Sequence, residues 1–440
     1  MENIVLDIPC GKIRGLVHED GTKAFLGIRY AKAERWRYPE EIKAWDGVYD
    51  ASKFGDACVQ KRTFCPETEE SFYYREFRRN DCFTYSEDCL YLNLWIPPNA
   101  RKVPVILYIH GGAFQNGCGN EAPYDGAEYA KRGILFATCN YRLGAFGFCC
   151  HPKLAERDGH TGNYGLYDQL AALKWISRNI EAFGGDPGAV TLMGQSAGAM
   201  SIQQLCQSKL ASPYIARAIM TSGGGIGREF ARFVPAEEAY SFWEKAFAKL
   251  GRGPEEWERA EAGQVFSVVD ELLAEDMQNI NYVMPVQDHA MILYTGEDVI
   301  ERQIQADIPY LMGTTKNDML PEVLKAMAEE WAVLQYQQKK KPSYCFLFAR
   351  NLPGDDKGAW HSSELWYTIG NLKKSWRPFQ EWDYYLSEKM MDYFENFVKT
   401  GNPNREGLVS WNAAEKPGNP VMVFSDTEIR MAVPEPYMKM

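Results

Sequence analysis

Long apolar runs and an excess of positive charge are both missing from this sequence. No segment approaches the ~18 consecutive apolar residues that a membrane-spanning helix requires. The 59 acidic residues outnumber the 48 basic ones, so the formal net charge is -11. A chain of this charge lacks the positive surface that binding to nucleic-acid phosphates requires. The only basic run, at residues 339–341, is interpreted as the solvated end of a helix. We therefore expect neither a membrane nor a nucleic acid as a partner.

Motifs for metal or dinucleotide chemistry are also absent. Neither His-Glu-x-x-His nor a pair of Cys-x-x-Cys motifs occurs in the chain. The glycine-rich segment at residues 223–227 lacks the Gly-x-Gly-x-x-Gly spacing that follows the first strand of a dinucleotide-binding fold. We therefore expect no bound metal and no cofactor.

The cysteines do not form the pattern of a disulfide-stabilised secreted protein. There are eleven of them, an odd number, and Cys149 and Cys150 are adjacent. Residues 1–9 lack both the basic start and the apolar stretch of a secretory signal. We expect a cytoplasmic protein whose cysteines are mostly reduced.

The composition indicates a large globular α/β protein. Apolar residues make up 45% of the chain and aromatic residues 13%, which is ample for a sizeable core. We find no linker, internal repeat or low-complexity segment, so we expect one domain over residues 1–440. Strands that alternate with helices predict a large, mixed, mostly parallel central sheet with helices on both faces. Residues 5–31 read as an antiparallel meander that precedes it.

The individual elements follow from hydrophobic patterns and turn residues. Near-continuous apolar runs, such as residues 103–109, fit strands that are buried on both faces. Helical spacing at residues 163–179 precedes an expected turn at residues 184–187. The other strands are predicted at residues 88–96, 134–139, 190–193, 216–221, 309–313, 344–348 and 421–424, and the other helices at residues 199–205, 320–338 and 383–399.

The chain is organised around Gly-Gln-Ser-Ala-Gly at residues 194–198. An apolar run precedes this pentapeptide and a helical segment follows it, which predicts a strand, a sharp turn and a helix. Side chains at positions 194 and 198 would collide with the neighbouring strand and helix, and glycine removes both collisions. The turn exposes the hydroxyl of Ser196 near the positive end of the helix dipole. Ser196 is therefore the candidate nucleophile.

A serine nucleophile needs a base, and histidine is the usual one because its pKa lies near neutrality. Of the six histidines, His361 is favoured because it lies in a loop after every main strand but the last. With this type of turn, the acid lies between the serine and the histidine in the chain. Asp318 is the candidate acid because it follows the strand at residues 309–313. Asp288 is the rival, although it follows no comparable strand.

His-Gly-Gly-Ala-Phe at residues 110–114 follows the strand at residues 103–109. Two glycines at the end of a strand allow backbone N–H groups to point inward, as an oxyanion hole requires. We predict the N–H groups of Gly112, Ala113 and Ala197 as the three donors.

Taken together, these ordered motifs resemble those of the type-B carboxylesterase family of α/β hydrolases, which includes bacterial para-nitrobenzyl esterases, animal carboxylesterases and cholinesterases. The resemblance spans nearly the whole chain. It rests on residues 25–31, 87–93, 110–114, 140–144, 162–169, 183–187, 194–199 and 397–404.

The resemblance implies an α/β-hydrolase fold and a serine carboxylesterase that acts on small-molecule esters. It also implies that Ser196, Asp318 and His361 form the catalytic triad and that Ser222 lies beside it. We expect a monomer or a small homo-oligomer. An amidase or peptidase would use the same residues and stays an alternative. A scaffold protein that has lost its chemistry is disfavoured because all three triad positions hold competent residues.

The sequence departs from the family pattern at several positions. Asp318 stands where the family usually has glutamate, and Arg29 stands where it commonly has proline. About 43 residues separate Asp318 from His361, which implies a reduced cap, with helical insertions around residues 230–300 and 320–341. Cys58 and Cys89 occupy positions that form a disulfide in secreted members, and we expect them to be reduced here.

Two stretches are candidates for the walls of a substrate cleft. They are the aromatic segment at residues 71–77 and the apolar helix at residues 320–338, although helical spacing of apolar residues in the second equally fits core packing. The short span before His361 leaves little chain to cover the site. We therefore predict an open cleft that accepts short to medium acyl groups on bulky alcohols or aryl leaving groups.

Overall fold

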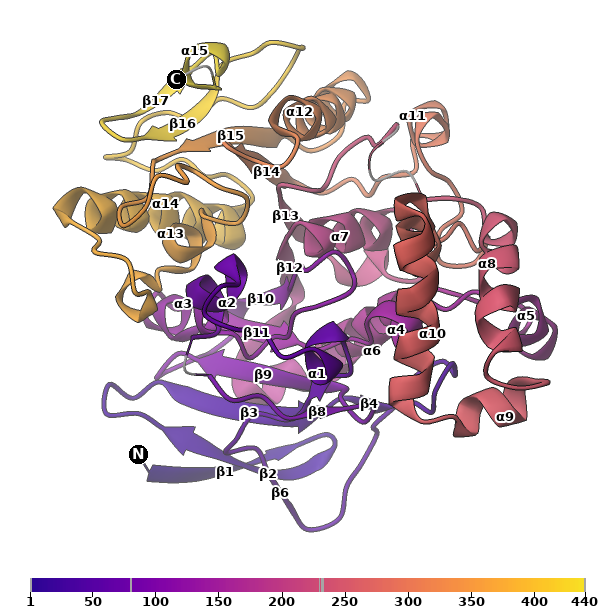
Figure 1. Cartoon of the computed structure of the whole chain (residues 1–440). Helices are drawn as coiled ribbons and strands as arrows, with labels where there is room; N and C mark the ends of the chain where they lie inside the picture. Colours follow the sequence, from indigo (N-terminus) through magenta and orange to yellow (C-terminus); the bar gives the residue numbers. More distant parts are fainter. Residues whose placement is uncertain (1, 80, 229, 231–232, 439–440) are drawn as a thin grey trace.

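A thirteen-stranded mixed sheet forms the centre of the protein in the computed structural model, which describes residues 2–79, 81–228, 230 and 233–438 (Figure 1). Its strands are β1 (Glu2–Ile8), β2 (Gly11–Val17), β3 (Lys23–Arg29), β6 (Val48–Asp50), β9 (Tyr91–Ile96), β10 (Val103–Ile109), β11 (Leu135–Cys139), β12 (Gly185–Gln195), β13 (Arg217–Thr221), β14 (Tyr310–Thr315), β15 (Ser343–Ala349), β16 (Val421–Ser425) and β17 (Ile429–Ala432). Two short pairs lie outside it: β4 (Ala31–Lys32) with β5 (Glu40–Glu41), and β7 (Ala57–Cys58) with β8 (Tyr85–Ser86).

The strands are hydrogen-bonded in the order β1-β2-β3-β9-β11-β10-β12-β13-β14-β15-β16-β17, and β6 pairs with β2. All pairs from β11 to β16 are parallel. The strands β1, β2, β3 and β9 pair in antiparallel fashion before the parallel part. The prediction of a mixed, mostly parallel sheet with an N-terminal meander is confirmed.

The α-helices are α1 (Lys61–Phe64), α2 (Phe72–Phe77), α3 (Ala127–Lys131), α4 (Gly144–Phe148), α5 (Pro152–Asp158), α6 (Tyr164–Asn179), α7 (Ala197–Gln207), α8 (Ala236–Ala248), α9 (Pro254–Arg259), α10 (Ala262–Glu275), α11 (Glu297–Arg302), α12 (Pro321–Gln337), α13 (Leu365–Ile369), α14 (Glu381–Thr400) and α15 (Glu435–Met438). Short 3₁₀ helices are η1 (Ala122–Tyr124), η2 (Ile180–Phe183), η3 (Ser212–Tyr214), η4 (Met277–Val283) and η5 (Leu372–Lys374). Within the described part of the chain, no helix has the length and apolarity needed to cross a membrane.

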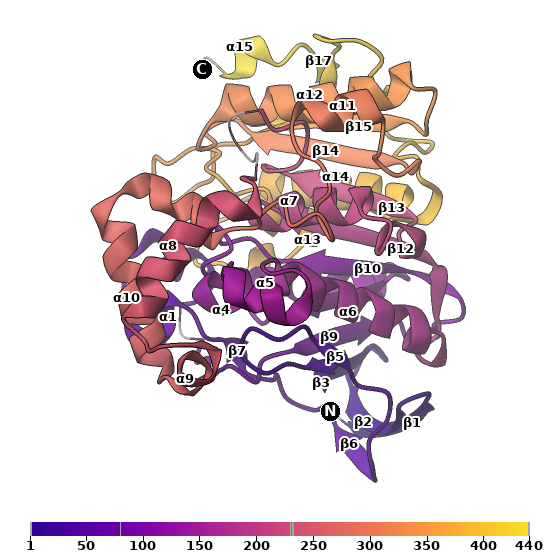
Figure 2. The same ribbon diagram turned by 90° about the vertical axis from the view of Figure 1, so that its right-hand side faces the viewer.

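The two faces of the sheet carry separate apolar cores. Along β10, Val105 and Leu107 belong to a cluster that includes residues of α6, α7 and α12, whereas Ile106 and Tyr108 belong to one with residues of α3, α13 and α14. The same helices lie on opposite sides of the sheet in both views (Figures 1 and 2). Because each strand is covered on both faces, its sequence is apolar throughout rather than alternating.

The helices α8, α9 and α10 lie to one side of the sheet (Figures 1 and 2), and a third apolar cluster joins them to residues of α4 and α5. Its largest side chains are Trp36, Trp243, Phe247 and Trp257. In contrast, α12 packs on the sheet. It comes from the segment expected as a second insertion at residues 320–341, and its Trp331 lies in the same core as residues of α6 and α7. Leu324, Met327 and Leu334 of this helix are also buried, as core packing requires.

Two boundaries among the main strands differ by three residues or more from those that the sequence predicts. The strand expected at residues 88–96 begins only at Tyr91. The turn expected at residues 184–187 is shorter, because β12 already begins at Gly185, which pairs with Val103 of β10. The register shifts between Val103 and Val105. This bulge accommodates Pro187, which has no N–H to donate to a regular ladder.

Cys58 and Cys89 form a disulfide, so the expectation that both are reduced is wrong. Pairing of β7 with β8 brings the two ends of the intervening loop together, and the Cα atoms of the two cysteines lie 4.9 Å apart. The other nine cysteines are free. The expectation had followed from the predicted compartment, which carries no information on how the two ends of this loop pair.

The loop closed by this disulfide carries α2, which a buried ion pair fixes to the rest of the protein. Arg377 donates from Nε and Nη2 to the two carboxylate oxygens of Glu76 at 2.9 and 2.7 Å, and both side chains are fully buried. The same guanidinium also binds Asp355. Trp376 adds a hydrogen bond from Nε1 to Glu76 at 3.1 Å. The charges are therefore paired in a site that water does not reach.

We expect Arg377→Met to lower the free energy of unfolding by about 3–5 kcal/mol, because it leaves the Glu76 carboxylate buried without its partner. Urea unfolding followed by tryptophan fluorescence measures the loss. Lys12→Met is the matched control, because Lys12 and its partner Asp7 are exposed and such pairs contribute about 0–1 kcal/mol. Equal effects of the two substitutions would contradict the assigned role of the buried pair.

Candidate active site

The candidate residues gather where the order of the parallel strands reverses. From β10 the chain forms β11 on one side of β10 and then β12 on the other. At such a point, the loops that leave the carboxyl ends of the strands diverge and leave a crevice in which ligands bind. Residues 110–114 follow β10 and Ser196 follows β12. Both predicted motifs therefore start from the same edge of the sheet.

Ser196 occupies the turn between β12 and α7, as the sequence predicts. Its backbone has φ +55° and ψ -126°, a conformation that few non-glycine residues adopt. Its N–H donates to the carbonyl oxygen of Thr221 at 2.9 Å, which ties the turn to β13. The residue is half-buried. The strained turn thus carries the hydroxyl at the end of the strand, where a substrate can reach it.

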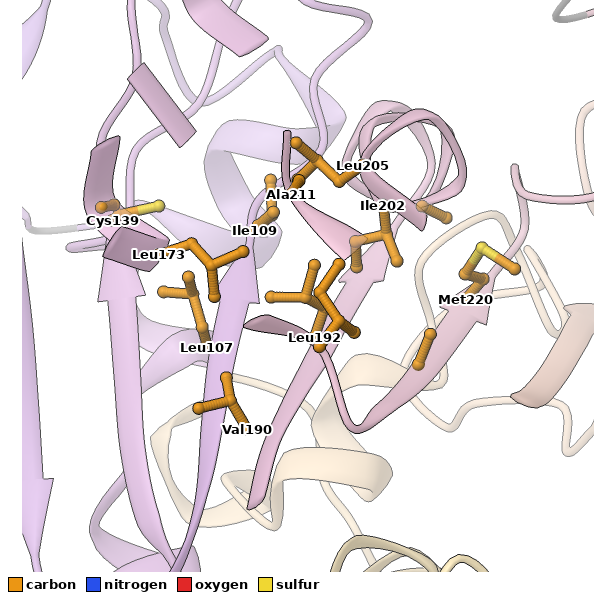
Figure 3. Packing of buried hydrophobic residues seen from close by; sticks show 14 of the residues in the cluster. Leu107, Ile109, Cys139, Leu173, Val190, Leu192, Ile202, Leu205, Ala211 and Met220 are labelled. Atoms are coloured by element: carbon orange, nitrogen blue, oxygen red, sulfur yellow. The ribbon is translucent and has the colours of Figure 1, made fainter. Parts of the chain in front are cut away.

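Gly194 and Gly198 allow this turn to approach β10. A Cβ atom at Gly198 would lie 2.0 Å from the carbonyl oxygen of Ile109, and one at Gly194 would lie 2.8 Å from the same oxygen. Leu192 of β12 and Ile202 of α7 pack in the same cluster as Ile109 (Figure 3). Any side chain at either glycine would therefore push the turn away from its core.

Asp318 and His361 lie together, 43 residues apart in the chain. Asp318 Oδ1 accepts a hydrogen bond from His361 Nδ1 at 2.6 Å. Backbone hydrogen bonds join the two loops, because Asn317 N–H donates to the Ala359 carbonyl oxygen at 3.0 Å and Ala359 N–H donates to Asn317 Oδ1 at 3.0 Å. The loops after the neighbouring strands β14 and β15 thus bring the acid to the histidine.

The Asp318 carboxylate is held in its ionised form. Burial by itself would raise the pKa of Asp318, but the hydrogen bond and charge of His361 outweigh it and hold the pKa below its ordinary value. Oδ2 accepts from Thr315 Oγ1 at 2.9 Å, and Oδ1 accepts from Met319 N–H at 2.8 Å. An ionised carboxylate orients the imidazole and stabilises its positive charge when it forms.

Asp288, the rival acid, lies elsewhere. Its Oδ1 accepts hydrogen bonds from the N–H groups of Ala290, Met291 and Ile292 at 2.9–3.1 Å, an arrangement that caps a turn. Burial raises its pKa, whereas these backbone bonds lower it. No hydrogen bond joins Asp288 to His361 among the described residues.

Gln195 is a polar neighbour of His361 to which the sequence analysis assigned no role. Its amide nitrogen lies 3.1 Å from His361 Nε2. Because Nδ1 donates to Asp318, Nε2 carries the lone pair and accepts from the Gln195 amide. Adjacency to Ser196 was the only available signal, and the direction of the side chain cannot be read from it. The proton-free nitrogen is the one that a general base requires.

The segment after β10 leaves two backbone N–H groups without a partner in the described part of the chain. Gly112 has φ +109° and Ala113 has φ +55°, and no described residue accepts a hydrogen bond from the N–H of either. Ala197 is the first residue of α7, so its N–H has no partner within the helix. A Cβ atom at Gly111 would lie 3.1 Å from Ser196 Cβ, which shows how close this loop is to the turn at Ser196.

Ser222 lies behind the Asp318 carboxylate. It follows β13, is buried, and has φ +52°. Its N–H donates to the Gly313 carbonyl oxygen at 2.7 Å. Its hydroxyl helps to lower the pKa of Asp318 from nearby, although it makes no hydrogen bond of normal geometry with any described residue. The structure thus brings Ser222 next to the predicted acid.

Glu364 is a second group for which the sequence analysis assigned no role. Its side chain is fully buried, and neither carboxylate oxygen has a hydrogen-bond partner of normal geometry within the described chain. Burial and the neighbouring charge of Asp318 raise the pKa of Glu364 to about 7, against opposing effects of Thr221 and His361. In the sequence, Glu364 could have been recognised only as an acidic residue three positions after His361.

The segment at residues 71–77, one of the predicted walls, lies beside His361. It includes α2, in which Tyr73 Oη donates to the His361 carbonyl oxygen at 3.3 Å. The other predicted wall, the helix at residues 320–338, buries its four large apolar side chains in the core instead. No group of three or more residues suited to hold a metal ion occurs among the residues that the structure describes.

Comparisons with known proteins identify the family and the fold of the chain. The family model described as "Carboxylesterase family" matches residues 2–340 and 319–433. The chain is 30% identical to para-nitrobenzyl esterase of Bacillus subtilis (strain 168) over 491 aligned residues, which cover 98% of this chain and 96% of that protein. It is 29% identical to carboxylesterase 4A of Bos taurus, over 92% and 88% of the two chains. A solved structure of PNB esterase matches 99% of this chain and 98% of its own with a TM-score of 0.86 and 28% identity, which confirms the predicted α/β-hydrolase fold.

The pH dependence of the free energy of unfolding tests whether the pKa of the buried Glu364 carboxyl is raised. Because its pKa of about 7 lies above the ordinary 4.5, the folded protein keeps a proton that the unfolded chain loses as the pH rises from 4.5 to 7. The parent therefore loses stability across this window relative to a variant that cannot ionise. We expect Glu364→Gln to gain up to roughly 3 kcal/mol relative to the parent.

Urea unfolding of the parent and Glu364→Gln at several pH values measures this difference. The exposed Glu388→Gln is the control, and its difference from the parent should stay flat over the same range. A flat difference for Glu364→Gln as well would show that the buried carboxyl does not titrate in this window.

Proposed function

The chain belongs to the carboxylesterase family and is a carboxylic ester hydrolase, and we propose that it cleaves esters in two acyl-transfer steps at Ser196. The observation that carries the proposal is the 2.6 Å hydrogen bond between Asp318 and His361, with the other nitrogen of the imidazole, Nε2, turned toward Gln195, the residue before Ser196. A strained serine, a base and an orienting acid are the parts that this reaction needs.

In the first step, the Ser196 hydroxyl oxygen attacks the ester carbonyl carbon while His361 Nε2 takes its proton. Gln195, whose amide lies 3.1 Å from Nε2, has to release this nitrogen before the proton moves. The negative charge that develops on the carbonyl oxygen is stabilised by the N–H groups of Gly112, Ala113 and Ala197. Two observations support this oxyanion hole: these N–H groups have no acceptor among the described residues, and the loop at residues 110–114 lies close to Ser196.

Collapse of the tetrahedral intermediate completes the acylation. The bond to the alcohol oxygen breaks, His361 gives its proton to the leaving alcohol, and Ser196 keeps the acyl group as an ester. In the second step, water gives a proton to His361 and attacks the acyl carbon. The bond from that carbon to Ser196 Oγ then breaks, His361 returns the proton to Oγ, and the acid leaves. Asp318 stays ionised throughout, which its lowered pKa favours. No cofactor is needed for either step.

We propose substrates with short to medium acyl groups on bulky or aryl alcohols, in an open cleft. The aromatic helix α2 beside His361 supports this choice, because Tyr73 is partly exposed there. The name of the Bacillus subtilis relative, para-nitrobenzyl esterase, points to an ester of an aromatic alcohol in that protein.

We also propose that the chain forms one domain in which residues 230–300 act as a small cap, which the separate apolar cluster of α8, α9 and α10 supports. The cytoplasmic location and the monomeric or small homo-oligomeric state stay predictions of the sequence.

Removal of the nucleophile tests the mechanism. We expect Ser196→Ala to lower kcat for para-nitrophenyl butyrate about 10⁶-fold, because the acyl group then has no oxygen to bind. Circular dichroism should show an unchanged fold. Ser212→Ala, at a partly exposed serine in η3, is the control and should keep the parent rate. Parent activity in Ser196→Ala would show that another group carries the reaction.

Paired substitutions test the choice of acid. We expect Asp318→Asn to lower kcat about 10⁴-fold, because the amide favours the wrong imidazole tautomer. Asp288→Asn is the matched control, since an asparagine oxygen can still accept the three backbone N–H groups at that turn. Its kcat should change little. A larger loss for Asp288→Asn than for Asp318→Asn would transfer the role to Asp288.

A further inference from the structure

A groove outside the candidate active site lies between α14, the loop at residues 407–409 and β17. Its volume is about 520 Å³, within the range of roughly 300–1,000 Å³ that is usual for sites of small ligands. None of the residues that line it belongs to the triad or to the loop at residues 110–114. The proposed mechanism therefore gives this groove no task.

One face of α14 forms the main wall of the groove. Glu381, Tyr385, Lys389 and Tyr393 follow one another at intervals of four residues, and Trp382 comes directly after Glu381. Side chains four residues apart are neighbours on the surface of a helix. This wall therefore combines three aromatic rings with a carboxylate at the start of the helix and an ammonium group about two turns later.

The rings of Trp382 and Tyr385 form a broad apolar platform. Their centroids are 5.3 Å apart and their planes differ by 31°. Trp382 is held in place because its Nε1 donates to the Ser425 carbonyl oxygen at 3.1 Å. On the other side, Tyr393 Oη donates to the Val409 carbonyl oxygen at 2.7 Å, which fixes the loop at residues 407–409 to the helix. The groove is thus preformed, and a ligand loses little free energy in ordering it.

Polar groups border this platform and are only partly paired within the protein. Tyr385 is 46% exposed, and its hydroxyl has no hydrogen-bond partner among the described residues. The Glu381 carboxylate also lacks a partner in the described part of the chain. Lys389 Nζ lies 5.6 Å from the centroid of the Tyr385 ring and 3.5 Å from Asp392 Oδ2. A hydrogen-bond acceptor and two donors are therefore available beside the rings.

This combination of groups discriminates between classes of ligand. Glu381 repels an organic anion and Lys389 repels an organic cation, whereas an apolar ligand would remove water from both charges without replacing its hydrogen bonds. A neutral saccharide avoids these costs. The C–H groups on one face of a sugar ring pack on the negatively polarised face of an aromatic ring. Its hydroxyls donate to a carboxylate and accept from an ammonium group.

We propose that this groove binds a neutral saccharide chain, with the C–H faces of its sugar rings on Trp382 and Tyr385 and its hydroxyls on Glu381 and Lys389. The proposal goes beyond ester hydrolysis and does not depend on the mechanism at Ser196. A β-1,4-linked chain with equatorial hydroxyls, such as cellotetraose or xylotetraose, presents the flattest face to the two rings. These two oligosaccharides are therefore the probes.

Isothermal titration of the full chain with cellotetraose and with xylotetraose tests the proposal. We expect the parent to bind at least one of them, and Tyr385→Ala to weaken that binding about tenfold, the size of one aromatic contact. Tyr384→Ala is the matched control, because Tyr384 is the neighbouring tyrosine on α14, is 43% exposed and does not line the groove. It should keep the parent affinity.

A second variant tests the other half of the platform. We expect Trp382→Ala to weaken saccharide binding by about the same factor as Tyr385→Ala. Circular dichroism checks the fold of each variant, because Trp382 is half-buried and donates a hydrogen bond to β16. If Trp382→Ala does not fold, the comparison of Tyr385→Ala with Tyr384→Ala decides the point, since both substitutions change exposed side chains.

Several outcomes would overturn the proposal. They are no binding of either oligosaccharide to the parent, parent affinity in Tyr385→Ala, or equal losses in Tyr384→Ala and Tyr385→Ala. Benzoate and benzylamine, titrated in the same way, represent charged aromatic ligands. If either of them bound the parent more tightly than both oligosaccharides and lost this binding in Tyr385→Ala, the groove would be a site for a small aromatic ion instead.

Discussion

The close approach of the Ser196 turn to the end of β10 is the constraint on which the rest of the site depends. Glycine at 194 and 198 lets the turn lie against the carbonyl oxygen of Ile109, where a side chain would come within 2.0–2.8 Å. The same approach places the loop at residues 110–114 beside the serine. A strained φ of +55° at Ser196 persists because packing of β12 and α7 in the core determines it from both sides.

A second convergence supplies the other half of the site. The loops after β14 and β15 are hydrogen-bonded to each other between Asn317 and Ala359, one residue before Asp318 and two residues before His361. Through this contact the two loops lie close enough for the Asp318 carboxylate to reach the imidazole at 2.6 Å.

Two buried polar groups near Asp318 are costly for the fold. The Glu364 carboxylate is buried without a hydrogen-bond partner of normal geometry within the described chain. The hydroxyl of Ser222 is also buried and also lacks such a partner. Each buried group of this kind costs about 1–3 kcal/mol. The large apolar cores on both faces of the sheet and the paired charges of Arg377 with Glu76 offset such costs elsewhere. Local rules of stability are thus broken next to the site and obeyed away from it.

Elements whose causes are local can be predicted from the amino-acid sequence. Apolar runs predict β10 and β11 to within a residue, and the pentapeptide around Ser196 predicts the turn, because glycine spacing and hydrophobic pattern act over a few neighbours. Three features become visible only in the folded chain: Asp318 rather than Asp288 is the partner of His361, Gln195 turns toward the imidazole, and Cys58 is joined to Cys89. Each of these depends on which strands become neighbours and on the direction of a buried side chain. Contacts between residues far apart in the chain set both, and a local pattern does not contain them.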